Sequence, residues 1–336
     1  MARIPVNVLE KSPVLVVFFL AMVILLATVD HVVAAEGFRS KPIRIVCPAP
    51  PGGGVDFACR TIGDPLANRA GQPVVVDNRP GASGAIGAQI VASALPDGNT
   101  LLLASSSTIA ANPAIQRQSY QTAMKDFSPV SMVSRIPYVL VVHPSVAAKS
   151  VVELIRLARS QPGRLNYASS AGAGSGSGLA MELFKMMASI DVVHIPYKGS
   201  AMATTELIGG QVETGFFNVI PVLPHVKTGR LRALGLSGPV RSPVMPETPT
   251  VAESGLPGYD ALQWYGVLVP ARTPRAIVNR LQQEIVTLLQ QADTRERLTR
   301  EGGDVIGSTP EQFAKHIESE ILKWTKVVNT ANIRAE

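Results

Sequence analysis

The chain has 336 residues, of which 46% are hydrophobic, 17% charged and 5% aromatic, with 28 Gly and 26 Pro. This composition excludes disordered, collagen-like and coiled-coil chains, and the length favours two domains, each with its own core. The net charge of +6 is modest. The basic residues are scattered without interleaved aromatic residues, so we expect no nucleic-acid partner.

Residues 1–35 are predicted to be a signal peptide. The basic residues Arg3 and Lys11 precede an apolar stretch at 14–29, and small residues allow cleavage after Ala35. A retained membrane anchor is the weaker alternative, because the stretch is short for a membrane span. We therefore expect the mature protein to be exported.

Cysteine and histidine usage predicts neither a disulfide scaffold nor a metal site. Cys47 and Cys59 are the only two cysteines, and we expect both in the core. A bridge between them is less favoured, because Cys47 should end a strand and Cys59 should lie in the following helix. The histidines of the mature chain lack the spacing of paired metal ligands, so we predict no metal and no cofactor.

Short β-branched runs alternate with helical patterns from Lys41 onward, which predicts two α/β halves. In the first half we expect strands at 43–47, 74–76, 101–104 and 130–133, and helices at 56–68 and 84–95. In the second half we expect strands at 139–142, 165–168, 192–195, 212–216 and 231–236, and helices at 151–160, 179–188 and 201–208. Pro65 should end or kink the first helix.

A strand at 264–269 and two long helices, which should start at Thr273-Pro274 and Thr309-Pro310, complete the pattern. Because these helices have no strands of their own to cover, we expect them to fold back onto the first sheet. The predicted fold class is α/β with two lobes, each a mostly parallel sheet flanked by helices. Lobe one comprises residues 38–137 plus 261–336, and lobe two comprises residues 138–260.

The chain would cross between the lobes twice, near 135–138 and 259–263, and two crossings permit a hinge. Open parallel sheets bind ligands beyond the carboxyl ends of their strands. Two such sheets facing each other predict a ligand cleft between the lobes.

A glycine loop of Pro51, Gly52, Gly53 and Gly54 joins the first strand to the first helix. Glycines let a ligand approach the backbone, and a helix start offers unpaired N–H groups with a partial positive charge. This pattern is typical of an anion site. Asp56 either caps the helix, which is favoured, or receives an ammonium or hydroxyl group of a ligand.

A second glycine- and serine-rich loop at 169–178 repeats the arrangement in the other half. Ser170, Gly174 and Ser175 would supply hydroxyl and N–H donors for a carboxylate or phosphate oxygen. A flexible linker is the alternative, but the loop lies between a predicted strand and an apolar helix.

Four further positions stand next to the predicted cleft. Ser106 and Thr108 follow the third strand, and they either face the cleft or are solvated in a loop. Asn218 either donates to a ligand or ties a turn. Lys198 would place a cation at the cleft edge, although a solvated lysine is more common.

Neither loop contains an enzyme motif. The nucleophile elbow, the dinucleotide fingerprint and the P-loop are all absent. An exported hydrolase that uses Ser175 remains an alternative, but no histidine of the sequence lies in or beside either glycine loop to act as its base. A receptor for a phosphorylated anion is a second alternative. We predict that the protein is not an enzyme.

Several motifs together resemble the Bug-type periplasmic solute receptors of tripartite tricarboxylate transporters over nearly the whole mature chain. The matching motifs are PPGGGVD at 50–56, GQPVVVDNRPGA at 71–82, PDG at 96–98, HIPYKGS at 194–200, GRLRAL at 229–234 and PTVAE at 249–253. Each motif alone is unspecific, and their order and spacing carry the resemblance.

The resemblance implies a two-lobe periplasmic binding protein of the type II-like kind. Such a receptor closes on a small carboxylate and delivers it to integral membrane permease subunits, and we expect a monomer. By position, the implied ligand contacts are Pro51, Gly52, Gly53 and Asp56 in lobe one and Ser170, Gly174, Ser175 and Asn218 in lobe two, with Ser106 and Thr108 beside them.

Two positions depart from the pattern of the family. Phe217 stands where a polar or acidic residue is common, and Gly178 stands where a polar or histidine side chain is common. The resemblance therefore implies a carboxylate site with altered selectivity, in which an amine-bearing ligand would lose a partner.

Overall fold

The computed structural model describes residues 41–170 and 172–334. The predicted signal peptide at 1–35 lies outside these residues. Within them, no helix is both long enough and apolar enough to span a membrane.

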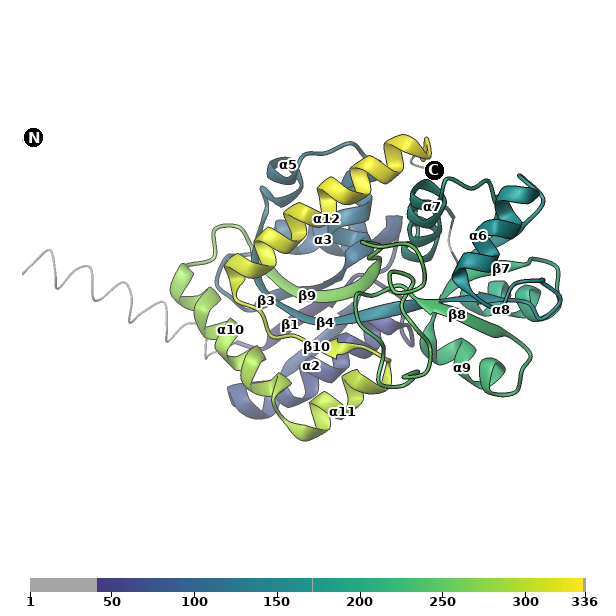
Figure 1. The fold of residues 1–336 in the computed structure, drawn as a ribbon. Coiled ribbons are helices and arrows are strands. Elements are labelled where there is room, and N and C mark those ends of the chain that lie inside the picture. Colours follow the sequence, from purple (N-terminus) through teal and green to yellow (C-terminus); the bar gives the residue numbers. More distant parts are fainter. Residues whose placement is uncertain (1–40, 171, 335–336) are drawn as a thin grey trace, which may run out of the picture.

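The first part of the chain forms the predicted βαβ series (Figure 1). Strands β1 (Ile43–Cys47), β2 (Val74–Asn78) and β3 (Thr100–Ser105) alternate with α2 (Gly54–Ala70), a 3₁₀ turn η2 (Ala82–Gly84) and α3 (Ala85–Ala92). A π-helical turn η3 (Ser107–Ala111) and the short helices α4 (Asn112–Ile115) and α5 (Tyr120–Met124) follow. The predicted strands and helices of this part are confirmed.

One long strand, β4 (Phe127–Val142), replaces the two separate strands predicted at 130–133 and 139–142. The segment at 135–138, where the first crossing is predicted, lies within this strand and pairs with a returning strand: Arg135 lies opposite Trp264, and Pro137 lies opposite Leu262. The first crossing between the halves is therefore extended, hydrogen-bonded backbone.

The rest of the chain adds the second series and the carboxyl-terminal helices. The second series is α6 (Val151–Ser160), β5 (Asn166–Ser169), α7 (Gly176–Ala188), β6 (Val193–Pro196), α8 (Ser200–Ile208), β7 (Thr214–Asn218), α9 (Val219–Lys227) and β8 (Arg232–Leu236). After it come β9 (Leu262–Pro270), α10 (Arg275–Leu289), α11 (Ala292–Arg300), β10 (Asp304–Val305) and α12 (Pro310–Thr330).

The strands of the described chain form one continuous sheet in the order β2-β1-β3-β9-β4-β7-β5-β6, with β8 and β10 also paired to β4. The outer strands are parallel in both halves, with β2, β1 and β3 at one end and β6, β5 and β7 at the other. Between them, β9 and β4 are antiparallel to their neighbours. Figure 1 shows β4 running through both halves, so the two parallel sheets share this strand.

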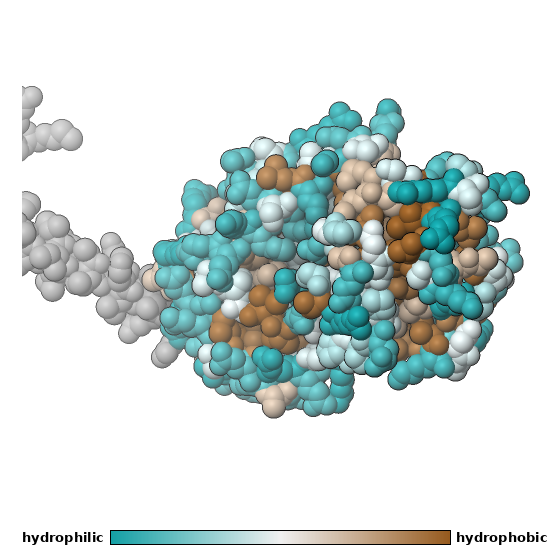
Figure 2. Space-filling model, viewed as in Figure 1, coloured by the Kyte–Doolittle hydropathy of each residue, from teal (hydrophilic) through white to brown (hydrophobic). Residues whose placement is uncertain are grey.

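The carboxyl-terminal helices fold back onto the first half of the sheet, as the sequence predicts, and they cover both of its faces. Alternation along β3 separates the two faces: Leu101 and Leu103 pack in the cluster that contains Leu281 of α10, and Leu102 packs in the cluster that contains Phe313 of α12. Most of the outer face seen in Figure 2 is hydrophilic. The apolar stripes of these helices therefore pack against the sheet.

The structure confirms one predicted helix boundary and contradicts another. Thr309 caps α12 through a reciprocal capping box with Gln312, as its pattern predicts. The prediction at Pro65 was wrong, because α2 continues past it to Ala70. Buried residues on either side of Pro65, such as Ile62 and Leu66, anchor the helix in the core, and this packing offsets the hydrogen bond that proline cannot make.

Both cysteines are buried in the core as free thiols. Cys47 ends β1, and Cys59 lies within α2. Burial raises the pKa of the Cys59 thiol, and the neighbouring Cys47 adds to this effect. The two residues therefore serve as small apolar side chains of the core.

Glu320 links α12 to the sheet through hydrogen bonds, and its substitution tests this packing. It is 5% exposed, accepts hydrogen bonds from the indole N–H groups of Trp264 at 3.1 Å and Trp324 at 3.0 Å, and pairs with Lys323. We predict that Glu320→Ala lowers the free energy of unfolding by about 3 kcal/mol, because it leaves buried donors unpaired. Urea denaturation measures this change.

The exposed Glu318 on the same helix provides the matched control. Glu318→Ala should change the unfolding free energy by less than about 0.5 kcal/mol. Equal destabilisation by the two substitutions would contradict the anchoring role of Glu320.

Candidate functional site: a cavity at the joint of the two halves

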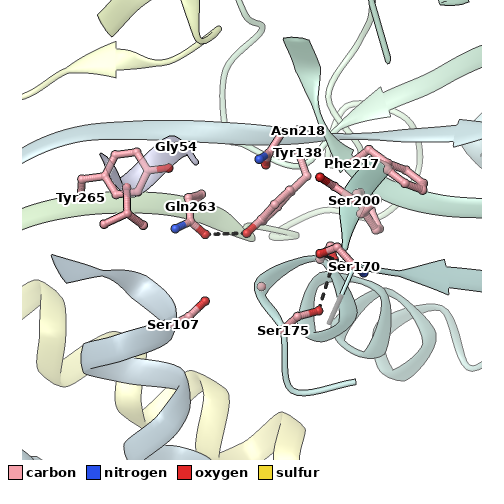
Figure 3. Close-up of a pocket in the computed structure, with 14 residues that line it drawn as sticks. Gly54, Ser107, Tyr138, Ser170, Ser175, Ser200, Phe217, Asn218, Gln263 and Tyr265 are labelled. Carbon is pink, nitrogen blue, oxygen red and sulfur yellow. Dashed lines mark hydrogen bonds between the residues drawn. The ribbon is translucent and has the colours of Figure 1, made fainter. Parts of the chain in front are cut away.

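A cavity of about 230 Å³ lies where the two halves of the chain meet. Figure 3 shows side chains from both halves pointing into it. Its lining residues are mostly hydroxyl, amide, glycine and aromatic groups, namely Gly54, Val55, Ser107, Tyr138, Ser170, Ser175, Gly176, Ser177, Ser200, Phe216, Phe217, Asn218, Gln263 and Tyr265. This volume is below that of drug-sized ligand sites, which start at about 300 Å³, and fits a smaller molecule.

Four helices of the described chain begin at this cavity. The lining includes Gly54 at the start of α2, Ser175 as the N-cap of α7, Ser200 at the start of α8 and Asn218 as the N-cap of α9. The first N–H groups of a helix have no partner within the helix, and the helix dipole adds a positive partial charge there. The cavity is thus surrounded by uncharged groups that favour an anion.

Two of these helix starts are glycines because a tyrosine of the joint stands against each. A Cβ atom at Gly54 would lie 2.5 Å from the hydroxyl oxygen of Tyr265 on β9. A Cβ atom at Gly176 would collide with the hydroxyl oxygen of Tyr138 on β4. Burial raises the pKa of both phenols, so both keep their protons at neutral pH and can act as hydrogen-bond donors.

Asp56 lies inside helix α2 and holds the first glycine loop in place through hydrogen bonds. It therefore acts neither as the cap of the helix nor as a free partner for a ligand. Gly53 is the N-cap, and Asp56 accepts hydrogen bonds from the backbone N–H of Gly52 at 2.9 Å, from Asn78 at 2.9 Å and from Arg60 at 3.1 Å. Burial alone would raise the pKa of this carboxyl, but these hydrogen bonds outweigh it and lower the pKa. A ligand ammonium would find the carboxylate already occupied.

Three serines organise the second loop at the start of α7. The Ser175 hydroxyl accepts a hydrogen bond from the Gly178 N–H at 3.2 Å and donates to the Gly172 carbonyl at 2.7 Å. The hydroxyl of Ser177 lies 3.1 Å from that of Ser170 and 3.3 Å from that of Ser175. The predicted position of this loop, between a strand and the start of a helix, is confirmed.

The departure at Gly178 has a steric cause. A Cβ atom there would lie 2.6 Å from the carbonyl oxygens of Gly172 and Ala173. The backbone of the second loop thus occupies the space that a side chain at this position would need. The other departure, Phe217, is among the lining residues but is 3% exposed, and its side chain packs in the core cluster that contains Val139 and Leu207.

Of the remaining predicted site residues, Asn218 lines the cavity with a side chain that makes no helix-capping hydrogen bond. Gly174 instead faces another part of the chain, because a Cβ atom there would lie 2.6 Å from Ile115 of α4. Pro51 and Gly52 are exposed at the tip of the first loop, and Gly53 is half-buried beside them.

The serine-rich turn after β3 reaches the cavity through a residue between the two predicted ones. Ser107 lines the cavity. The hydroxyl of Ser106 donates to the Gln263 side chain at 3.2 Å, and the Thr108 hydroxyl pairs within the turn with Ser105 at 3.3 Å. Ser106 and Thr108 therefore support the lining.

Several lining residues were not predicted from the sequence. Tyr138, Gln263 and Tyr265 lie on the antiparallel strands of the joint, and Ser200 starts α8. Ser200 is the last residue of the HIPYKGS motif, which carries the family resemblance but predicted no contact for this serine. Lys198 in that motif is exposed and is not among the lining residues.

One sequence inference about histidines was wrong. The Nε2 atom of His194 lies 2.7 Å from the hydroxyl oxygen of Ser169, at the first residue of the second glycine loop. The parallel register of β5 and β6 brings the two strands together, although they are distant in the sequence. Ser169 is fully buried, and neither residue is among the lining residues of the cavity.

The lining residues include no Asp, Glu, Lys, Arg or His among the described part of the chain. Nor does that part contain a group of three or more His, Cys, Asp or Glu side chains that could hold a metal ion. The cavity therefore offers N–H, O–H and amide groups, with aromatic rings for the uncharged remainder of a ligand.

Known proteins resemble this chain over most of its length. Residues 58–333 match the family described as the tripartite tricarboxylate transporter family receptor. Protein BugT of Bordetella pertussis is 37% identical over 297 residues, which cover 88% of this chain and 91% of BugT.

Two solved structures are similar in fold and sequence. A protein of R. palustris solved with adipate is 34% identical, with a TM-score of 0.74 over 88% of this chain and 98% of that one. MatC from Rhodopseudomonas palustris, solved with bound malate, is 32% identical, with a TM-score of 0.73 over 86% of this chain and 99% of that one. These matches confirm the resemblance and the fold class inferred from the sequence. The chain belongs to the tripartite tricarboxylate transporter receptor family.

Proposed function

We propose that the exported protein is a periplasmic receptor that captures a small carboxylate and delivers it to the membrane subunits of a tripartite transporter. The carboxylate would bind between lobe one, residues 38–137 plus 261–336, and lobe two, residues 138–260. The observation that carries the proposal is a cavity surrounded by four helix starts and lined, among residues 41–170 and 172–334, by no ionised side chain. Adipate and malate in two similar proteins support the ligand class.

The direct contacts of the carboxylate would come from Gly54, Ser170, Ser175 and Asn218, which line the cavity. The other residues that the sequence singled out would support these contacts: Pro51, Gly52, Gly53 and Asp56 shape the first loop, Ser106 and Thr108 the turn after β3, and Gly174 the second loop. Hydrogen bonds to a charged group contribute about 1.5–3 kcal/mol each. Several such bonds account for micromolar binding, which requires about 8 kcal/mol.

Closure of the lobes on the ligand would provide capture without a covalent step. Residues of both halves line the cavity, so a ligand that contacts both favours the closed arrangement by its difference in affinity for the two states. The receptor would act as a monomer. Ser175 would not serve as a nucleophile, because its hydroxyl is engaged within its own loop and no basic side chain lines the cavity in the described part of the chain.

The first prediction concerns the ligand class. At 100 times its dissociation constant, a bound carboxylate should stabilise the protein by about 2.7 kcal/mol and raise the melting temperature by roughly 5 °C. Differential scanning fluorimetry with adipate, malate, succinate and benzoate measures this shift, after native mass spectrometry has verified that the protein is ligand-free.

Dimethyl adipate is the matched control, because it keeps the chain of adipate and removes its charge. It should leave the melting temperature unchanged, and inorganic phosphate should have a smaller effect than the acids. Flat melting curves for all four acids would contradict the proposal. A phosphate shift that exceeds every carboxylate shift would favour the phosphorylated-anion alternative instead.

The second prediction uses the contact between Gly54 and Tyr265. Gly54→Ala should weaken the binding of a carboxylate found in that screen by at least about tenfold, because the added methyl group would displace the Tyr265 hydroxyl at 2.5 Å and shift the helix start. Isothermal titration calorimetry measures the affinity.

Tyr265→Phe removes the colliding oxygen, so the double variant Gly54→Ala with Tyr265→Phe should bind more tightly than Gly54→Ala alone. Gly209→Ala at the far end of α8, where a Cβ atom has ordinary space, is the control and should bind as the wild type does. Unchanged affinity in Gly54→Ala would exclude this helix start from the site.

A further inference from the structure

Gln263 lies at the base of the cavity, where two hydroxyl groups contact its side-chain amide. It lies on β9, opposite Ile136 of β4, and its side chain lines the cavity. Its amide oxygen lies 2.6 Å from the hydroxyl of Tyr138 on β4 and 3.2 Å from the hydroxyl of Ser106 after β3. The amide is thus held by one group on β4 and by another in the turn after β3.

The two hydroxyl groups determine which way the amide faces. An amide oxygen has two lone pairs, and the O–H groups of Tyr138 and Ser106 occupy both. Burial raises the pKa of the Tyr138 hydroxyl, so it remains a donor at neutral pH. If the amide were reversed, its NH₂ group would face both hydroxyls and both would lose this acceptor.

The orientation leaves the two N–H donors of Gln263 for the cavity. Figure 3 shows the amide oxygen on the side of Tyr138 and the nitrogen on the opposite side. Since no Asp or Glu is among the lining residues of the described chain, the complement of these donors is an oxygen atom of the bound molecule.

We propose that Gln263 is a specificity-determining residue that donates its side-chain N–H to an oxygen of the bound carboxylate, held in this orientation by Tyr138 and Ser106. The inference rests on the proposed function and deepens it, because it names the strand residue that recognises an acceptor atom. It also predicts that a side chain at position 263 with acceptor oxygens in place of the N–H donors would repel the bound carboxylate.

Isothermal titration calorimetry with adipate and with malate tests the inference at pH 7.5. Gln263→Glu keeps the size of the side chain and still accepts from both hydroxyls, but it replaces two donors with a negative charge. Relative to the wild type, its dissociation constant should rise by about 100-fold, and that of Gln263→Met, which only removes the donors, by about tenfold.

Gln89→Glu is the matched control for charge, because Gln89 is exposed on α3 and is not among the cavity residues. It should bind as the wild type does. The melting temperature of each ligand-free variant shows whether the protein is folded.

A double-mutant cycle tests the positioning role of Tyr138. Tyr138→Phe should weaken binding by about threefold in the wild-type background, because the amide loses one of its two anchors, and should have no further effect in Gln263→Met. A purely structural role for Tyr138 would give the same loss in both backgrounds.

Each outcome decides between the claims. If the wild type binds adipate or malate and folded Gln263→Glu binds it equally well, this inference is overturned and the proposed function stands. If the wild type binds neither acid, the inference fails together with the carboxylate ligand class. A large loss in Gln263→Glu, a smaller loss in Gln263→Met and no loss in Gln89→Glu would support it.

Discussion

An anion can be buried without a charged partner only where N–H and O–H dipoles surround it, and this constraint organises the joint between the two halves of the protein. The desolvation of a lone carboxylate is costly. Fixed helix starts oppose that cost without an arginine or lysine. Helices α2, α7, α8 and α9 meet this requirement, because each begins at the cavity rather than ending there.

The sheet also changes from parallel to antiparallel strand pairing at the joint. Parallel strands on each side carry the helix starts to one edge, whereas the antiparallel strands β4 and β9 pass through the middle and supply tyrosines and a glutamine. The pairing of Gly54 with Tyr265 and of Gly176 with Tyr138 repeats the same contact on each side. A hinge made of paired strands would let the halves move while these hydroxyls stay at the base of the site.

Sequence patterns predicted most of the architecture, but of the predicted site residues only Gly54, Ser170, Ser175 and Asn218 line the cavity. The glycine loops between strands and helices were recognisable, because a turn that precedes an apolar helical pattern has few alternatives. The joint residues were not, because Tyr138 and Gln263 belong to strands whose apolar pattern hides their role, and only pairing across 125 positions brings them together.

Two other failures have local causes. Helix α9 carries Pro221 and Pro224, which mask a helical pattern, although Pro221 falls in its first turn where proline is tolerated. The histidine beside Ser169 was missed because the contact depends on the register between β5 and β6. Spacing along the chain carries no such information.

The most direct test of the central claim is a titration of ¹⁵N-labelled protein with adipate, followed by the backbone amide resonances of Gly54 and Gly176. These two amides begin α2 in one half and α7 in the other. If helix starts of both halves hold the carboxylate, both resonances should shift together and saturate with the same dissociation constant. Saturable shifts confined to one half, or to exposed lysine-bearing segments, would contradict the account.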